Sequence, residues 1–96
     1  MTTSASDSEK YIRNPDIVFR NMDGSGFLAD QNNDAMYYLN ETGTAIWHFL
    51  QDPAAVTDII TTMQAAFPDT PEQQIEQDIR TTFMRLVEKG MVIPEQ

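Results

Sequence analysis

The sequence predicts an α+β domain in which a three-stranded antiparallel sheet is followed by three helices. Over residues 16–39, apolar and β-branched residues come in short runs separated by clusters of turn-forming residues. Over residues 40–90 the apolar residues recur instead at intervals of three and four, which is the spacing of one helix face. Because a small sheet and amphipathic helices must each bury one face, we expect them to share a single core.

Three short strands are expected in the first half of the chain. Each is a run rich in β-forming residues, and clusters that tolerate positive φ separate the runs. The strands are expected over residues 16–20, 27–30 and 35–39, with turns over 21–26 and 31–34. Because short turns join consecutive strands as hairpins, the three strands are expected to pair antiparallel.

The first two helices are marked by the residues at their ends. Asn40 is a suitable N-cap for a helix over residues 41–51, whose apolar residues share one stripe. Asp52 and Pro53 provide a cap and a first-turn proline for the second helix. That helix is expected to end near Phe67, because the proline that follows cannot continue it.

The third helix has the clearest end signals. Thr70 is placed as its N-cap, Pro71 as its first residue and Gln73 at the capping-box position, and Gly90 stops it. Its apolar stripe consists of Ile75, Ile79, Phe83, Leu86 and Val87. Residues 91–93 are expected to pack afterwards as a short extended segment.

Length and composition predict one folded domain over residues 14–96, preceded by a disordered tail over residues 1–13. The chain has 96 residues, of which 41% are hydrophobic, enough for one core. The start of the chain is Ser/Thr-rich and acidic without an apolar stretch, so it resembles neither a signal peptide nor an anchor.

The charge balance limits the classes of partner. Six Lys and Arg against fifteen Asp and Glu give a formal charge of −9, which repels polyanions, so we expect no nucleic acid partner. No apolar run approaches the ~20 residues of a membrane span, so we expect no membrane association. With no Cys, the sequence suits a reducing compartment, and a cytoplasmic protein is expected.

No residues make a convincing catalytic group, so we expect neither an enzyme nor a bound metal or cofactor. His48 is the single histidine and lies beside Trp47 and Phe49, a setting typical of a packed or half-exposed side chain. The sequence Gly24-Ser-Gly26 is too short, and lacks the Lys, for a phosphate-binding loop. The carboxylates fall in turns or on solvated helix faces, where solubility explains them.

The segment Leu-Asn-x-x-Gly-x-x-Ile-Trp over residues 39–47 is the most informative stretch. Leu39 is expected to fill the core, Gly43 to permit close approach, and Trp47 to anchor the first helix. With its flanking elements this segment resembles the PqqD-like proteins, named for pyrroloquinoline quinone synthesis protein D and also called RiPP recognition elements.

The resemblance extends from about residue 14 to residue 93. Its other matching elements are the first strand with Phe19-Arg20, the second strand with Leu28, and the helices over residues 56–67 and 78–90. The chain departs from the family at residues 51–53, where Gln-Asp-Pro replaces an acidic-glycine turn.

The resemblance implies a winged helix-turn-helix-like domain that binds the leader of a ribosomally made precursor peptide. Such a domain presents the leader to a modifying enzyme, of the radical S-adenosylmethionine (radical SAM) or peptidase type. In the family the leader pairs as an added strand with the third strand, beside the third helix. The peptide-binding residues implied here are Met36 and Tyr38, or Ala35 and Tyr37 if the strand shows its other face, with Ile75, Asp78, Ile79, Thr82 and Phe83.

Several alternatives remain open at this point. The helix stripe with Ile75, Ile79 and Phe83 could be wholly core. The chain could be a structural subunit of a modifying enzyme that holds no peptide itself. A DNA-binding winged helix is disfavoured, because acidic residues interrupt any basic face on the third helix. An exposed edge strand could also pair with a second copy and give a homodimer.

Overall fold

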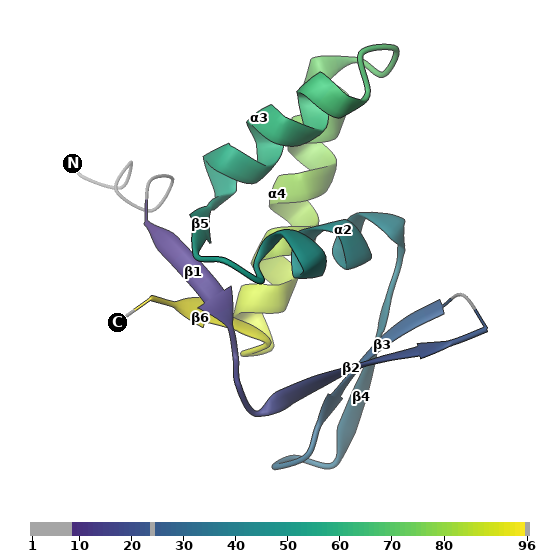
Figure 1. Ribbon diagram of the computed structural model, residues 1–96, viewed down its shortest axis with the longest axis vertical. Coiled ribbons are helices and arrows are strands. Elements are labelled where there is room, and N and C mark those ends of the chain that lie inside the picture. The colour runs from purple at the N-terminus through teal and green to yellow at the C-terminus, as the bar shows by residue number, and fades with distance from the viewer. Residues whose placement is uncertain (1–8, 24, 96) are drawn as a thin grey trace.

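The computed structural model describes residues 9–23 and 25–95 of the chain. In order, these residues form β1 (Lys10–Arg13), β2 (Ile17–Met22), β3 (Ser25–Asp30), β4 (Ala35–Leu39), α2 (Glu41–Phe49), β5 (Ala54–Ala55), α3 (Val56–Ala66), α4 (Glu72–Glu88) and β6 (Val92–Pro94). Figure 1 shows α4 running through the helical half of the molecule, with α3 beside it and α2 across it. The predicted α+β class is confirmed.

The predicted three-stranded sheet is present, in the order β2-β3-β4 with antiparallel pairing throughout. Its register places Phe19 opposite Leu28 and Leu28 opposite Tyr37. Strand β2 runs two residues beyond the prediction, to Met22, which pairs with Ser25. The turn between β2 and β3 is therefore shorter than predicted, because residues that also suit a turn pair as part of the two strands.

The inner face of this sheet packs against α2. Leu28 and Leu39 are buried there, and Gly26 comes so close that a Cβ on it would lie 2.9 Å from the Phe19 ring and 3.1 Å from the Thr44 hydroxyl oxygen. Only glycine fits such a contact without a shift of its neighbours. The sheet and α2 are thereby held together at the end of β4.

Helix α2 begins as predicted. The side chain of Asn40 accepts a hydrogen bond from the Gly43 N–H at 2.8 Å, which satisfies one of the free amides of the first turn. The helix ends at Phe49, two residues before the expected end.

The predicted start of α3 is wrong. Residues 54–55, expected in its first turn after the Asp52 cap, form the short strand β5, and the helix begins at Val56. The Ala55 N–H donates to an Asp58 carboxylate oxygen at 3.1 Å, so Asp58 caps the helix in place of Asp52. The reason is long-range, since β5 pairs with β1, which lies more than 40 residues earlier.

The predicted cap of α4 is also wrong, whereas its end is confirmed. The helix begins at Glu72 with Pro71 in the N-cap position, and Pro71 has no side chain that could cap it. Thr70 lies one residue further out, in a turn where its N–H donates to the Phe67 carbonyl. At the other end Gly90 has φ +73°, and the Met91 N–H donates to the Leu86 carbonyl. This left-handed residue closes the helix and turns the chain into β6.

A second sheet in the order β5-β1-β6 corrects the predicted tail. Residues 10–13, assigned to a disordered segment, form the central strand β1, and residues 1–8 lie outside the described residues. The Tyr11 ring meets Phe83 edge-on at 5.0 Å between centroids, and Arg13 Nε donates to the Trp47 carbonyl at 2.8 Å. The folded domain therefore includes these residues.

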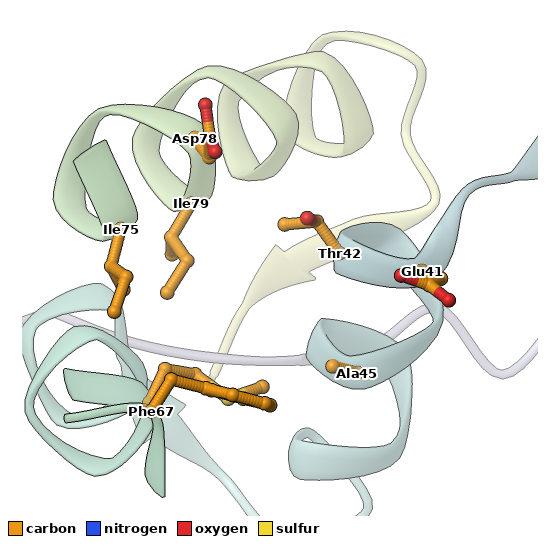
Figure 2. A pocket seen from close by; sticks show the side chains of 8 residues that line it. Glu41, Thr42, Ala45, Phe67, Ile75, Asp78 and Ile79 are labelled. Atoms are coloured by element: carbon orange, nitrogen blue, oxygen red, sulfur yellow. The ribbon is translucent and has the colours of Figure 1, made fainter. Parts of the chain in front are cut away.

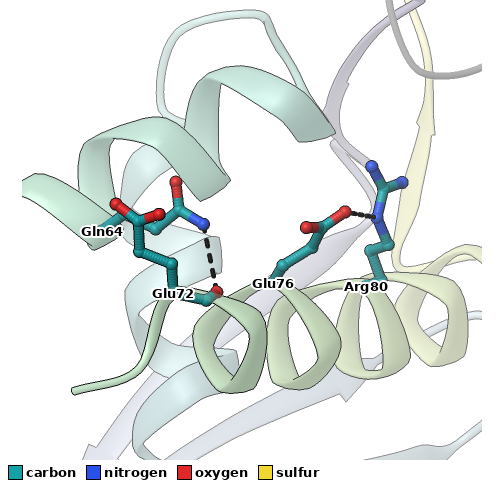
Figure 3. Close-up of polar contacts among 4 residues, drawn as sticks. All are labelled: Gln64, Glu72, Glu76 and Arg80. Atoms are coloured by element: carbon teal, nitrogen blue, oxygen red, sulfur yellow. Dashed lines mark hydrogen bonds and ion pairs between the residues drawn. The ribbon is translucent and has the colours of Figure 1, made fainter.

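The core is one cluster to which every helix and both sheets contribute. Its buried members on α4 are Ile75, Ile79, Phe83 and Leu86. Away from the core, Gln64 Nε2 donates to the Glu72 carbonyl at 3.1 Å and links α3 to the first turn of α4 (Figure 3). Glu76 and Arg80 form an ion pair at 2.9 Å on an exposed flank of α4, worth about 0.5 kcal/mol at most. No helix among the described residues is long and apolar enough to cross a membrane.

Replacing Tyr11 by Ala tests whether β1 belongs to the folded core. The change removes the edge-on contact with Phe83, so we expect the free energy of unfolding to fall by about 2 kcal/mol. Tyr11→Phe keeps the ring and is the matched control. Urea denaturation measures both variants, and a Tyr11→Ala midpoint equal to that of the unchanged protein would contradict the assignment.

Candidate functional site

Strand β4 is the feature on which the candidate site depends. It pairs with β3 along one edge, and no described residue pairs with its other edge. An unpaired strand edge presents backbone N–H and C=O groups to which a further strand can be added. The predicted third strand is thus an edge strand over the predicted residues.

A hollow lies between this strand and α4. It is lined by Tyr37, Tyr38, Leu39, Asn40, Gly43, Thr82 and Arg85. Gly43 and Asn40 belong to the capped start of α2, so the N-cap that fixes α2 also shapes one end of the hollow. A segment added to β4 on this side would lie against α4.

A second hollow lies where α2, α3 and α4 meet. It is lined by Glu41, Thr42, Ala45, Met63, Phe67, Ile75, Asp78 and Ile79. Figure 2 shows Ile75 and Ile79 pointing from α4 towards Phe67, with Thr42 and Ala45 of α2 opposite. Its volume of ≈ 180 Å³ far exceeds the ~10–15 Å³ that one water needs, so it has room for an apolar side chain.

The two hollows adjoin. Asp78 and Thr82 are one helical turn apart on α4 and line the second and the first hollow, respectively. At the start of α2, Asn40 and Gly43 line the first hollow, and the two residues between them line the second. We call the two hollows together the α4 groove.

The predicted residues on α4 divide between core and groove. Ile75, Ile79 and Phe83 are only 8%, 2% and 4% exposed, so all three are core residues. The outer edges of the two isoleucines form the floor of the second hollow, whereas Phe83 lines neither hollow and packs against Tyr11. Asp78 and Thr82 line the groove. The apolar stripe of α4 thus belongs to the core, and the side of the helix next to it, with Asp78 and Thr82, borders the groove.

Strand β4 turns towards α4 the face with Ala35 and Tyr37, which was the predicted alternative to Met36 and Tyr38. Lys89 Nζ lies 5.3 Å from the centre of the Tyr37 ring, which packs against the core cluster, and Ala35 shares that face. Met36 and Tyr38 lie on the opposite face, 61% and 59% exposed, although Tyr38 also reaches the rim of the first hollow.

Sequence reasoning missed several groove residues. Arg85 lies on the Thr82 side of α4, three residues further on, and helical spacing could have indicated it. Phe67 is exposed next to a proline, which marks a large apolar side chain that the core does not use. Nothing local indicates Thr42 or Ala45, because only the packing of α2 on α4 places them there.

Four charged side chains stand at the rim of the α4 groove. Arg85 lines the first hollow and Lys89 lies over Tyr37 beside it, while Glu41 and Asp78 line the second hollow. None of the four forms an ion pair with another described residue.

The described part of the chain contains no candidate metal centre. Within residues 9–23 and 25–95, no three His, Cys, Asp or Glu side chains are grouped so that they could hold a metal ion. His48 is exposed, and its ring lies 5.1 Å from that of Phe19. The geometry of the site is that of a binding groove.

Residues 26–92 match the family described as "Coenzyme PQQ synthesis protein D (PqqD)". The chain belongs to the PqqD family. The matched segment contains β4, α2, α3 and α4, and therefore the whole α4 groove. The resemblance predicted from the sequence is confirmed.

Two solved structures share the fold of this PqqD-family chain. One is named "TbiB1 in Complex with the TbiA(beta) Leader Peptide"; it has a TM-score of 0.71 at 18% identity, over 84% of this chain and 93% of that one. The other is named "Lasso peptide synthetase B1 complexed with the leader peptide"; it has a TM-score of 0.72 at 24% identity, over 88% and 98%. No curated protein sequence matches this chain.

The loop that leads into β4 gives a pH-dependent prediction. Asp30 accepts hydrogen bonds from the Asn33 side chain at 2.8 Å and from two backbone amides, and these bonds lower its pKa, with the Asn33 side chain as the main cause. Because the folded-state pKa is depressed, the stabilisation is present above the ordinary Asp pKa of about 3.9 and is lost as the pH falls through the folded value.

We therefore expect the protection of the β4 amides, measured by two-dimensional NMR relative to the intrinsic exchange rate at each pH, to fall at the acid end of a titration. Asp30→Asn should remove this dependence on pH, because its side chain does not titrate. An Asp30 carboxyl that titrates at or above the ordinary value would contradict the assignment.

Proposed function

We propose that this PqqD-family chain is a non-catalytic adaptor that binds the leader segment of a ribosomally synthesised precursor peptide and presents it to a modifying enzyme. The observation that carries the proposal is the edge of β4 with which none of residues 9–23 and 25–95 pairs, beside the α4 groove. Both solved structures of similar fold are, by their names, complexes with leader peptides, which supports a peptide ligand here. Ribosomal products arise in the cytoplasm, so we place the adaptor there.

Backbone pairing alone would give weak and unselective binding. Each added hydrogen bond contributes about 0.5–1.5 kcal/mol net, and β4 has only five residues. The second hollow supplies the missing affinity, because Ile75, Ile79 and Phe67 offer apolar surface to one leader side chain. Burying such a side chain contributes roughly 1.5–3 kcal/mol. The ligand is thus an extended segment with an apolar residue for this hollow.

The modifying enzyme, of the radical SAM or peptidase type that the family implies, is the second partner in this proposal. The outer face of the β2-β3-β4 sheet supports it, since Met22, Met36 and Tyr38 are exposed there. The Tyr38 ring meets Phe27 at 5.5 Å between centroids and extends this apolar face across two strands. Exposed apolar surface of this kind is typical of protein interfaces.

A pair of adjacent threonines provides the test. Thr82 is half-buried in the first hollow, whereas Thr81 is exposed on another side of α4. Thr82→Trp should fill the hollow and weaken binding of the synthetic leader of the precursor encoded beside the gene more than tenfold, or about 1.4 kcal/mol. Thr81→Trp adds the same side chain outside the groove and should leave the Kd unchanged. Calorimetric titration measures both.

Three outcomes would contradict the proposal. Equal affinities of the two variants would place the peptide elsewhere, once circular dichroism has shown that both are folded. Strand addition would be excluded if the leader caused no shift of the β4 amide signals in the NMR spectrum of the unchanged protein. Binding to the enzyme alone, with no leader binding by the isolated chain, would favour a structural subunit.

A further inference from the structure

The basic and the acidic side chains of the groove rim lie at opposite ends of the groove. Arg85 and Lys89 stand at the end beside Tyr37, near the middle of β4. Glu41 and Asp78 stand at the other end, around the second hollow. The groove therefore runs from a basic end at β4 to an acidic and apolar end at the start of α2.

These charges are free to meet a ligand. Glu41, Asp78 and Arg85 are exposed and make no ion pair with any described residue, and Lys89 makes only its contact with the Tyr37 ring. Of the other cations, Arg80 is paired with Glu76 and Arg13 is bound to the Trp47 carbonyl, whereas Lys10 and Arg20 are exposed but lie outside the groove. In a chain of net charge −9, the basic end is thus a local exception in an acidic field.

The spacing of the charges can be compared with an extended peptide. Arg85 is seven residues beyond Asp78 on α4 and Lys89 eleven, which is roughly 10 and 16 Å along the axis at 1.5 Å per residue. An extended strand covers these distances in roughly three to five residues. One leader segment of ordinary strand length therefore reaches both ends.

The direction of the segment follows from the sheet. Strand β4 is antiparallel to β3, and antiparallel pairing is slightly the more stable arrangement per residue. A segment added antiparallel to β4 starts near Leu39, next to the second hollow, and ends near Ala35. Its N-terminal part would meet Glu41 and Asp78, and its C-terminal part Arg85 and Lys89.

We propose that this groove selects leader segments by charge order: a basic residue next to an apolar anchor, followed roughly three to five residues later by acidic residues. The inference rests on the proposed function and specifies its substrate class. Each rim ion pair is solvated and adds about 0.2–1 kcal/mol. Two such pairs at the basic end together change the Kd about two- to thirtyfold.

A random twelve-residue peptide display library, selected on the full chain, tests the proposal without a known ligand. Selected peptides should show the predicted order of basic, apolar and acidic positions. Selection on Arg85→Glu/Lys89→Glu should replace the acidic preference by a basic one and keep the apolar position. The matched control is Lys10→Glu/Arg20→Glu, which changes the net charge equally at exposed positions outside the groove and should leave the order intact.

A selected peptide is then synthesised and titrated at two salt concentrations. We expect Arg85→Glu/Lys89→Glu to weaken it at least fivefold in 50 mM salt and less in 500 mM salt, because salt screens exposed pairs. Three results would each overturn the inference and leave the adaptor function standing. The selected motif could show no order of charges, its order could be the same for Arg85→Glu/Lys89→Glu, or its acidic residues could precede the apolar anchor. A library with no enriched motif would overturn both.

Discussion

The burial of one stripe on α4 is the constraint on which the rest of the structure depends. Ile79, Phe83 and Leu86 are almost fully enclosed, and α2, α3 and β6 all pack against this helix. Because the stripe is committed to the core, the flank with Asp78 and Thr82 is held at a fixed rotation beside β4. The backbone that carries this side of the groove is therefore positioned by the core before a ligand binds, which reduces the entropy lost on binding.

The second sheet explains why no described residue pairs with the free edge of β4. Gly90 turns the chain out of α4 directly into β6, and β6 pairs with β1, which also pairs with β5. Strand β1 therefore lies in the second sheet, on the opposite side of α4 from β4 (Figure 1). Had residues 10–13 paired with β4 instead, the chain would have closed its own candidate site.

Local signals predicted those parts of the fold that depend on neighbouring residues. The Asn40 cap, the strands with their turns and the Gly90 stop are each decided within a few positions. β1 and β5 were missed because their pairing is non-local: Arg13 lies opposite Val92, near the other end of the chain. Thr70 was misplaced by one residue, since Pro71, expected as the first helical residue, occupies the N-cap position and Thr70 belongs to the turn after α3.

The site was predicted in outline because the family resemblance identified the strand and the helix that form it. The resemblance left the inward face of β4 open, since residues 35–38 include apolar side chains on both faces, although the expected burial of Leu39 together with strand alternation indicates the face with Tyr37. The burial of Leu39 decides it and brings Tyr37 to the inner side. The residues of α2 and α3 in the groove depend on helix packing, which no local pattern encodes.

An open strand edge also invites pairing with a second copy, and the homodimer stays a prediction. The charges at the ends of β4 oppose it. Asp34 precedes the strand and Glu41 follows it, so antiparallel pairing of two copies would bring an acidic residue from each copy together at both ends. Two chains of net charge −9 also repel one another at low salt. A foreign segment differs from a second β4, because it can place basic residues beside Glu41 and Asp78 and acidic residues beside Arg85 and Lys89 of the groove rim.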